Sequence, residues 1–124
     1  LETAYRTSPF FEFYEDDIAP LYHNTFHSLM DFNLKTIETI CECLQIKMPL
    51  DRTKVFEVDV TDKIDGRTLI NSKTKLQFQQ AQYVQVFEDR NDFIPNLSIL
   101  DLLFNEGTNA LTYLKNLNLN LSNA

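Results

Sequence analysis

Glycine and proline are scarce in this sequence of 124 residues, which holds two of the former and four of the latter. A fold of many short strands needs such residues at its tight turns, so their scarcity favours helices. No apolar run approaches the ~20 residues that a membrane-spanning helix requires, and no apolar core of a signal peptide is visible. Because 44% of the residues are hydrophobic, we expect a single helical domain.

Cysteine is equally rare, and its two copies are Cys41 and Cys43. On a helix, residues two apart point about 200° away from each other, so these thiols cannot form a disulfide together. A lone pair of this kind also lacks the ligand number of a structural zinc site. Two free thiols are typical of a reducing compartment, which predicts a cytoplasmic location. Two glycines cannot build a phosphate-binding loop, and no cofactor is predicted.

Positive charge is also in short supply, since 11 Lys and Arg face 18 Asp and Glu, for a net charge of −7. This excess of acid argues against nucleic acid as a partner. The charge is uneven, because residues 1–46 carry eight acids against two bases, whereas residues 47–75 carry seven bases against five acids. The middle segment is therefore where a small anion would bind, and the alternative is a solvated loop with scattered lysines.

The strongest periodic signal predicts a helix from about Ser28 to Gln45, in which the apolar residues recur at spacings of four and three: Met30, Leu34, Ile37, Cys41 and Leu44. Two earlier helix starts are predicted at Ser8-Pro9 and at Asp16-Asp17, with Pro20 in the first turn of the second. All three elements are expected to pack into one helical body.

A further helix is predicted near the carboxyl end, where residues 99–104 are apolar nearly all round. Ser98 and Asp101 resemble a capping box at its start, and Gly107 ends it as a cap residue. We expect residues 99–104 and the stripe of residues 34–44 to bury each other and to form the core.

Two short segments have a strand pattern instead. Residues 55–60 alternate between apolar and polar, and residues 83–87 are rich in β-forming types, so the two are expected to pair. The turn dipeptide Asp65-Gly66 lies between them. The predicted fold is therefore mainly α, a small helical domain with a minor two- or three-stranded β element. It covers residues 1–117 and is followed by a polar tail at 118–124.

A metal site has one set of candidates. His23, His27 and Asp31 recur every four residues, and on a continuous helix they would share a face that suits zinc or iron. The stretch between the histidines lacks the glutamate of the metalloprotease motif, and a helix start near Ser28 would break the alignment. Exposed histidines are the alternative, and no bound metal is predicted.

The segment from Tyr83 to Gly107 interleaves polar residues with structural ones. It reads YVQVF at residues 83–87 and FIPNLSILDLLFNEG at residues 93–107. This run resembles the carboxy-terminal signature of the WbqC-like protein family. Other parts of the chain resemble that family too, namely residues 4–11, residues 22–33 and Asp65-Gly66-Arg67. Two features depart from it, Thr108, where relatives usually have proline, and the stretch after Leu117.

The resemblance implies a bacterial cytoplasmic protein linked to surface polysaccharide biosynthesis of the O-antigen type. Members of the family are roughly twice as long as this chain, which also begins in what looks like a helix end. We therefore expect the carboxy-terminal half of a larger protein, with the missing amino-terminal half as a partner.

Two hypotheses for its role follow. In the first, the protein is a transferase acting on a sugar nucleotide or glycan precursor. Arg67 would then pair with phosphate, and three polar side chains would contact the ligand, Tyr83, Gln85 and Asn96. Each residue also has a structural interpretation, in loop hydrogen bonds or in an ion pair with Asp65. Ser98, Asp101 and Gly107 are predicted to be structural.

In the second hypothesis the chain is a non-catalytic module that packs on the missing half or on a biosynthetic partner. The aromatic entry at residues 10–14 would then contribute to an exposed apolar patch, through which a homo-oligomer could also form.

Overall fold

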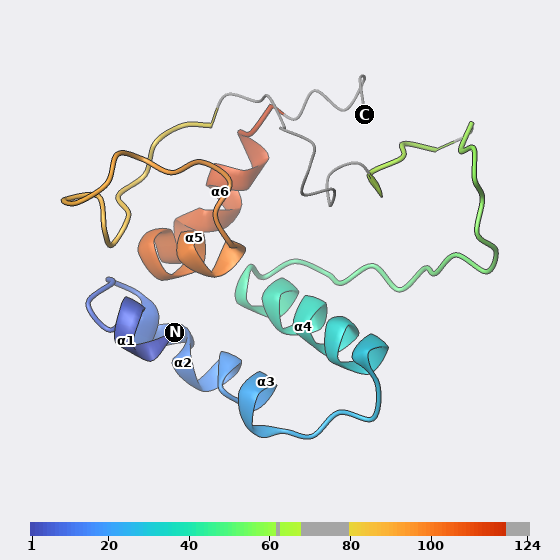
Figure 1. Cartoon of the computed structure of the whole chain (residues 1–124), viewed down its shortest axis with the longest axis horizontal. Coiled ribbons are helices and arrows are strands. Elements are labelled where there is room, and N and C mark those ends of the chain that lie inside the picture. Colours follow the sequence, from blue (N-terminus) through green and yellow to red (C-terminus); the bar gives the residue numbers. More distant parts are fainter. Residues whose placement is uncertain (62, 68–79, 119–124) are drawn as a thin grey trace.

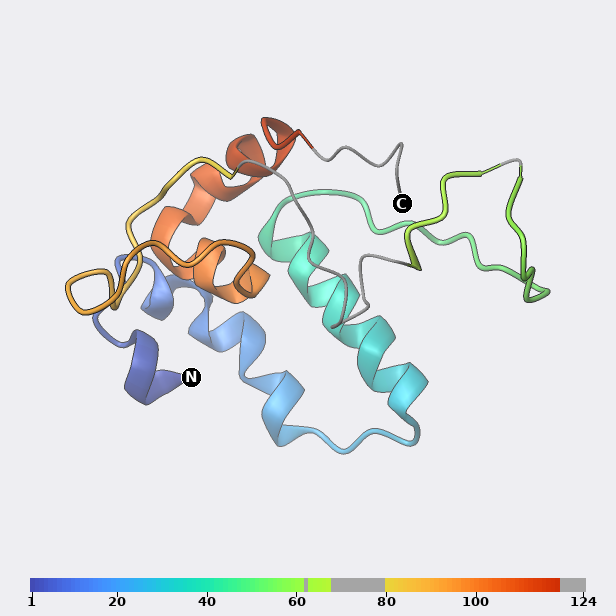
Figure 2. The same ribbon diagram turned by 45° about the horizontal axis from the view of Figure 1, so that its top comes forward.

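The computed structural model describes residues 1–61, 63–67 and 80–118, and over these ranges the chain is mainly helical. Figures 1 and 2 show the helices gathered in one body, from which residues 47–61 depart as a long excursion without helix. None of the described helices has the length and apolar character that crossing a membrane demands. The elements in chain order are α1 (Glu2–Tyr5), α2 (Phe11–Ile18), α3 (Pro20–His23), α4 (Leu29–Cys43), α5 (Ile99–Glu106), the 3-10 turn η2 (Gly107–Asn109) and α6 (Ala110–Lys115).

Helix α2 is the element on which the core is built, because both α4 and α5 pack against it. Its buried side chains recur at spacings of three and four and so share one face, namely Phe11, Tyr14 and Ile18. From α5, Leu103 and Phe104 are fully buried, and each such side chain contributes about 1.5–3 kcal/mol to folding. The Phe104 ring lies 5.1 Å from both the Tyr5 and the Phe11 ring centroids. The core therefore joins α1, α2 and α5 around one aromatic side chain.

Helix α4 buries less of its apolar stripe than the periodicity predicts. Leu44 belongs to the core cluster and Ile40 packs against it, but Met30 and Ile37 are 64% and 48% exposed. The prediction that residues 34–44 and residues 99–104 bury each other is thus right only at the carboxyl end of α4. The physical reason is that α4 is apolar on two sides, and periodicity does not tell which side has a neighbour.

Helix boundaries follow the predicted caps at two of four places. Ser28 accepts a hydrogen bond from the backbone N–H of Asp31 at the start of α4, and Ser98 accepts one from Leu100 at the start of α5, as N-cap residues do. The other two predicted starts are wrong. Helix α2 begins only at Phe11, because Ser8 turns back and donates its hydroxyl to the Tyr5 carbonyl. The same helix runs through Asp16-Asp17 without a break, so no new helix starts there. Pro20 does open α3.

Gly107 ends α5 in a conformation that suits glycine alone. Its φ is +55°, and a Cβ added there would lie 2.5 Å from the Phe10 ring. The Phe10 backbone N–H donates to the Phe104 carbonyl at 2.9 Å, which presses this ring onto the helix end. Glycine is therefore required at the end of α5 for a steric reason as well as a conformational one.

The predicted β element is absent from the part of the chain that the structure describes. Val55 and Phe56 are 72% and 77% exposed in the excursion, and residues 83–87 pair with no other strand. Burial alternates over residues 83–85, where Tyr83 and Gln85 are buried and Val84 is 66% exposed, but Phe87 is 48% exposed. A side chain replaces the partner strand, because the Gln85 amide bonds both backbone groups of Ile94.

Two predictions fall largely or partly outside the described residues, the polar tail almost entirely and the basic middle segment in part. The polar tail at 118–124 is described only at Asn118, and the basic middle segment is described without Lys73 and Lys75.

The aromatic entry at residues 10–14 does not form the predicted exposed patch. Phe11 and Tyr14 lie in the core with 4% and 2% exposed, and Phe13 alone of this group is largely exposed, at 66%.

Candidate functional site

The most deeply buried charged group among the described residues is Asp101, which is 3% exposed. Ser98 sets the start of α5, so Asp101 falls in its first turn and points into the protein rather than back at the cap. The Tyr5 hydroxyl donates to Oδ1 of Asp101 at 2.9 Å, and the Tyr83 hydroxyl donates to Oδ2 at 2.6 Å. Each carboxylate oxygen thus has its own phenol. The capping-box role predicted for Asp101 gives way to this inward pairing.

The two phenols are strongly held in their protonated state. Burial, together with the hydrogen bond to Asp101 and its negative charge, raises the pKa of Tyr5 to about 12. Burial is also the main cause that holds the pKa of Tyr83 well above its usual value, with Asp101 adding to it. At neutral pH both groups act as hydrogen-bond donors and neither serves as a base. We call this group, Tyr5, Asp101 and Tyr83, the tyrosine–aspartate cluster.

The cluster links three parts of the chain that are far apart in sequence, α1, α5 and the segment at residue 83. The Tyr83 ring also packs edge-on against Phe93 and Tyr113, at 5.5 and 5.3 Å between centroids. Tyr113 in α6 donates to the Ala81 carbonyl. Hydrogen bonds to a charged group each contribute about 1.5–3 kcal/mol, so the arrangement is chiefly a stabilising one.

Gln85, a predicted ligand contact, is 6% exposed and closes a loop. Its side-chain amide donates to the Ile94 carbonyl at 2.8 Å and accepts from the Ile94 N–H at 2.9 Å. Its own N–H donates to Glu88 at 3.1 Å. The structure brings Gln85 and Tyr83 together on one extended segment, but both direct their polar groups at protein partners.

Asn96 is exposed on the loop before α5 and has a φ of +58°. Asparagine tolerates this left-handed conformation better than most residues. The Asn96 N–H donates to the Gln80 side chain at 2.6 Å, which fixes the loop that leads into Ser98. Its backbone geometry thus gives this position a structural role.

Arg67 follows the excursion of residues 47–61 along the chain, and its side chain bonds residues of that stretch as well as Asp65. Its guanidinium grips Asp65 from two nitrogens and donates to the carbonyls of Glu57 and Val58 at 2.7 and 3.0 Å. It also lies over the Phe56 ring, 5.3 Å from the centroid, which is within the reach of about 6 Å for a cation–π contact. These bonds lower the pKa of Asp65 to about 2. The loop encloses a hollow of about 290 Å³.

The metal candidates are separated by the predicted break. His23 ends α3, His27 lies in the connecting loop, and Asp31 is in the first turn of α4. Asp31 instead bonds Ser28 at 2.8 Å. Across residues 1–61, 63–67 and 80–118, no group of three His, Cys, Asp or Glu side chains is placed to hold a metal ion.

The two cysteines are free, as their spacing predicts. Burial, with Asp17 and Glu42 nearby, raises the pKa of the Cys43 thiol to about 11. A thiol with a raised pKa is a poor nucleophile at neutral pH, which argues against Cys43 as a reactive centre.

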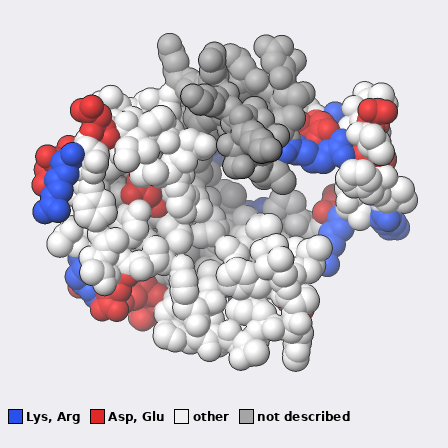
Figure 3. All heavy atoms as spheres, in the orientation of Figure 1, with Lys and Arg blue, Asp and Glu red and all other residues white. Residues whose placement is uncertain are grey.

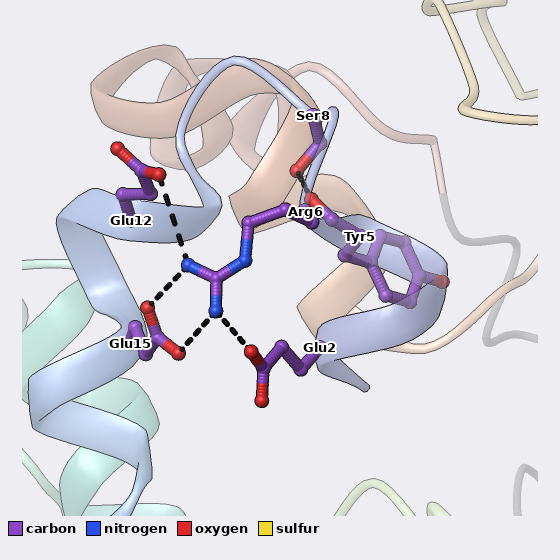
Figure 4. Close-up of polar contacts among 6 residues, drawn as sticks. All are labelled: Glu2, Tyr5, Arg6, Ser8, Glu12 and Glu15. Carbon is purple, nitrogen blue, oxygen red and sulfur yellow. Dashed lines mark hydrogen bonds and ion pairs between the residues drawn. The ribbon is translucent and has the colours of Figure 1, made fainter.

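Sequence reasoning missed the ion cluster around Arg6. The guanidinium of Arg6 pairs with Glu15 at 3.0 Å, with Glu12 at 3.7 Å and with Glu2 (Figure 4), and it lies 5.1 Å from the Phe11 ring centroid. The spacing of four between Glu2 and Arg6 is a signal that could have found part of it. Next to this cluster lies a cleft of about 200 Å³, lined by residues of α1, α2 and α3 with Phe104.

The fold and these clusters define a small α-helical domain whose polar candidates mostly serve its own structure. Comparison with protein families matches residues 1–73 and 61–113 to the WbqC-like protein family. The chain belongs to this family, and the match covers most of its length. No curated protein matches the chain, and no solved structure does.

Proposed function

We propose that this domain is a binding module of a WbqC-like protein, and that it serves bacterial surface polysaccharide biosynthesis by packing on another protein segment. The polysaccharide setting comes from what the family resemblance implies. The binding role comes from one observation, the exposed stripe of α4. Met30 and Ile37 are 64% and 48% exposed, and Leu29 is 74% exposed. Apolar residues gathered in this way mark an interaction surface.

Figure 3 supports this role. The surface over α3, α4 and the loop between them is almost free of charge in this view, whereas charged residues gather elsewhere. Tyr22 on α3 is also largely exposed, at 64%. We call this surface, formed by Tyr22, Leu29, Met30 and Ile37, the α3–α4 face.

The hydrogen bonds of the polar candidate residues also favour a binding module over a ligand site, because these residues bond other parts of the protein. Tyr83 and Gln85 give their hydrogen bonds to Asp101 and Ile94, so a ligand would have to break buried contacts to reach them. Replacing such contacts is costly because the abandoned partner stays buried without a bond. We propose the amino-terminal part of longer WbqC-like proteins as the partner, with a biosynthetic protein as the alternative.

The test is assembly measured by size-exclusion chromatography with light scattering. The chain is mixed with the separately expressed amino-terminal part of a longer WbqC-like protein, as wild type and as Met30→Glu and Ile37→Glu. Lys35→Gln is the matched control, because it changes the charge of α4 by the same amount outside the apolar stripe, at an exposed position paired with Glu38. We expect a complex that the two stripe variants lose and the control keeps. Absence of any complex, or equal loss in all three, refutes the proposal.

A second function is favoured by the hollow beside Arg67. Arg67 and Lys63 both line it, together with the Phe56 ring, which is a combination that suits a phosphate and a stacked base. In this alternative the protein is a transferase acting on a sugar nucleotide or glycan precursor. For this, a phosphate would have to replace some of the hydrogen bonds that Arg67 donates to Asp65.

Isothermal titration with a panel of nucleotide sugars tests the second function. We expect binding that Arg67→Ala abolishes and that Arg90→Ala leaves unchanged, since Arg90 is an exposed arginine remote from the hollow. No heat from any nucleotide sugar, with a folded sample, removes this function and leaves the binding module untouched.

A further inference from the structure

The cleft between α1, α2 and α3 has an aromatic floor. Phe104 and Phe11 line it and are otherwise buried, with 0% and 4% exposed. Ile18 and Tyr22 add further apolar surface. With a volume of about 200 Å³, the cleft is large enough for one apolar side chain and too small for a folded surface. Single anchors of this kind dominate the energy of many protein interfaces.

The edge of the cleft is acidic. Glu2 and Glu15 line it, and with Glu12 they surround the single guanidinium of Arg6 (Figure 4). This group of three carboxylates and one guanidinium is net negative, and two of the carboxylates, those of Glu2 and Glu15, line the cleft. The wider surroundings have the same sign, because residues 1–46 carry eight acids and two bases.

We propose that this cleft binds a polypeptide segment in which an aromatic side chain is flanked by lysine or arginine. The ring enters the cleft and packs on the surface that Phe11 and Phe104 line, and the basic neighbours meet the carboxylates of Glu2 and Glu15. A second copy of this chain is a poor occupant, because its net charge of −7 opposes an acidic edge. This inference rests on the binding-module role proposed above, and it names a second contact surface with its own chemistry.

The experiment titrates the isotopically labelled chain with short peptides and follows backbone amide shifts by NMR. The probe is a blocked peptide with the core lysine–phenylalanine–lysine, and two matched peptides replace either phenylalanine by alanine or both lysines by glutamate. We expect shifts at the cleft residues with the first peptide, at least about tenfold weaker binding of the other two, and weakening by salt.

Three variants test the location. Ala19→Phe places a ring in the cleft from a lining position and should abolish binding. Glu2→Gln should weaken binding about threefold, whereas Glu12→Gln should not. Glu2 and Glu12 both pair with Arg6 and both are exposed, but of the two only Glu2 lines the cleft. Thermal melts confirm that each variant is folded.

Equal binding of the three peptides overturns the proposal, and so does binding that Ala19→Phe leaves intact. Dimerisation at the concentrations used, with shifts at the same residues in the absence of peptide, also overturns it in favour of a second copy. If the peptides fail while the α4-dependent complex forms, the cleft proposal falls and the binding module stands. Peptide binding without that complex gives the reverse result.

Discussion

From the geometry of the tyrosine–aspartate cluster we predict how much each phenol contributes to the free energy of unfolding. Tyr83→Phe removes the 2.6 Å hydrogen bond to Oδ2 of Asp101 and leaves the ring and its aromatic contacts in place. A hydrogen bond to a charged group is worth about 1.5–3 kcal/mol, and the acceptor here stays buried without a replacement. We expect Tyr83→Phe to lower the free energy of unfolding by about 2 kcal/mol.

Tyr5→Phe removes the longer bond, 2.9 Å to Oδ1, at a half-buried position that water can approach. We expect it to cost about 1 kcal/mol, less than the change at Tyr83. The assay is urea unfolding at pH 7 followed by circular dichroism, with ΔG extrapolated to water. Tyr22→Phe is the control, because Tyr22 is 64% exposed, and it should cost close to nothing.

The double variant provides the sharper test. Since both phenols bond one carboxylate, we expect the combined loss to differ from the sum of the single losses by about 0.5 kcal/mol or more. Strict additivity together with a negligible cost for Tyr83→Phe would refute the reasoning, because Asp101 would then not depend on its phenols.

Three further outcomes are expected. Because the pKa of Tyr5 is raised to about 12 from an unfolded value near 10, its contribution is complete below pH 10 and is lost as pH rises through 12; alkaline unfolding curves should show this loss, and Tyr5→Phe should reduce it. Gly107→Ala should cost about 2 kcal/mol or more in urea unfolding, whereas Gly66→Ala, at an exposed loop position, should cost much less. Gln85→Ala should leave the helical circular dichroism unchanged but speed proteolysis in residues 85–94, whose closure depends on its amide.

The sequence predicted the helices α4 and α5 better than it predicted the first helix starts and the strands. Ser28 and Ser98 identified the starts of α4 and α5 because a cap is a local interaction, formed within three residues of the chain. Ser8-Pro9 failed because the Ser8 hydroxyl bonds a residue behind it, a choice that local pattern does not decide. The strand at residues 83–87 failed because a side chain, Gln85, took the place of a neighbouring strand.

The candidate site was predicted less well, because its contacts are long-range. Tyr5 and Asp101 are 96 positions apart, and no spacing rule relates them. Arg67 was correctly linked to Asp65 at short range, but its bonds to the carbonyls of Glu57 and Val58 depend on how the excursion folds. Sequence therefore singles out polar residues that the fold uses, but it does not predict their long-range protein partners.

The hydrogen bonds that join the two ends of the loop of residues 85–94 come from one side chain, Gln85, beside the contact of Phe93 with the Tyr83 ring. In a strand ladder, many backbone bonds must part together, whereas here one rotation of the Gln85 side chain releases both the N–H and the carbonyl of Ile94. The loop can therefore open as an independent unit while α5 keeps its place. Because the Ile94 N–H is bonded by the Gln85 side chain, the exchange of this amide proton with solvent should report the local opening of the loop.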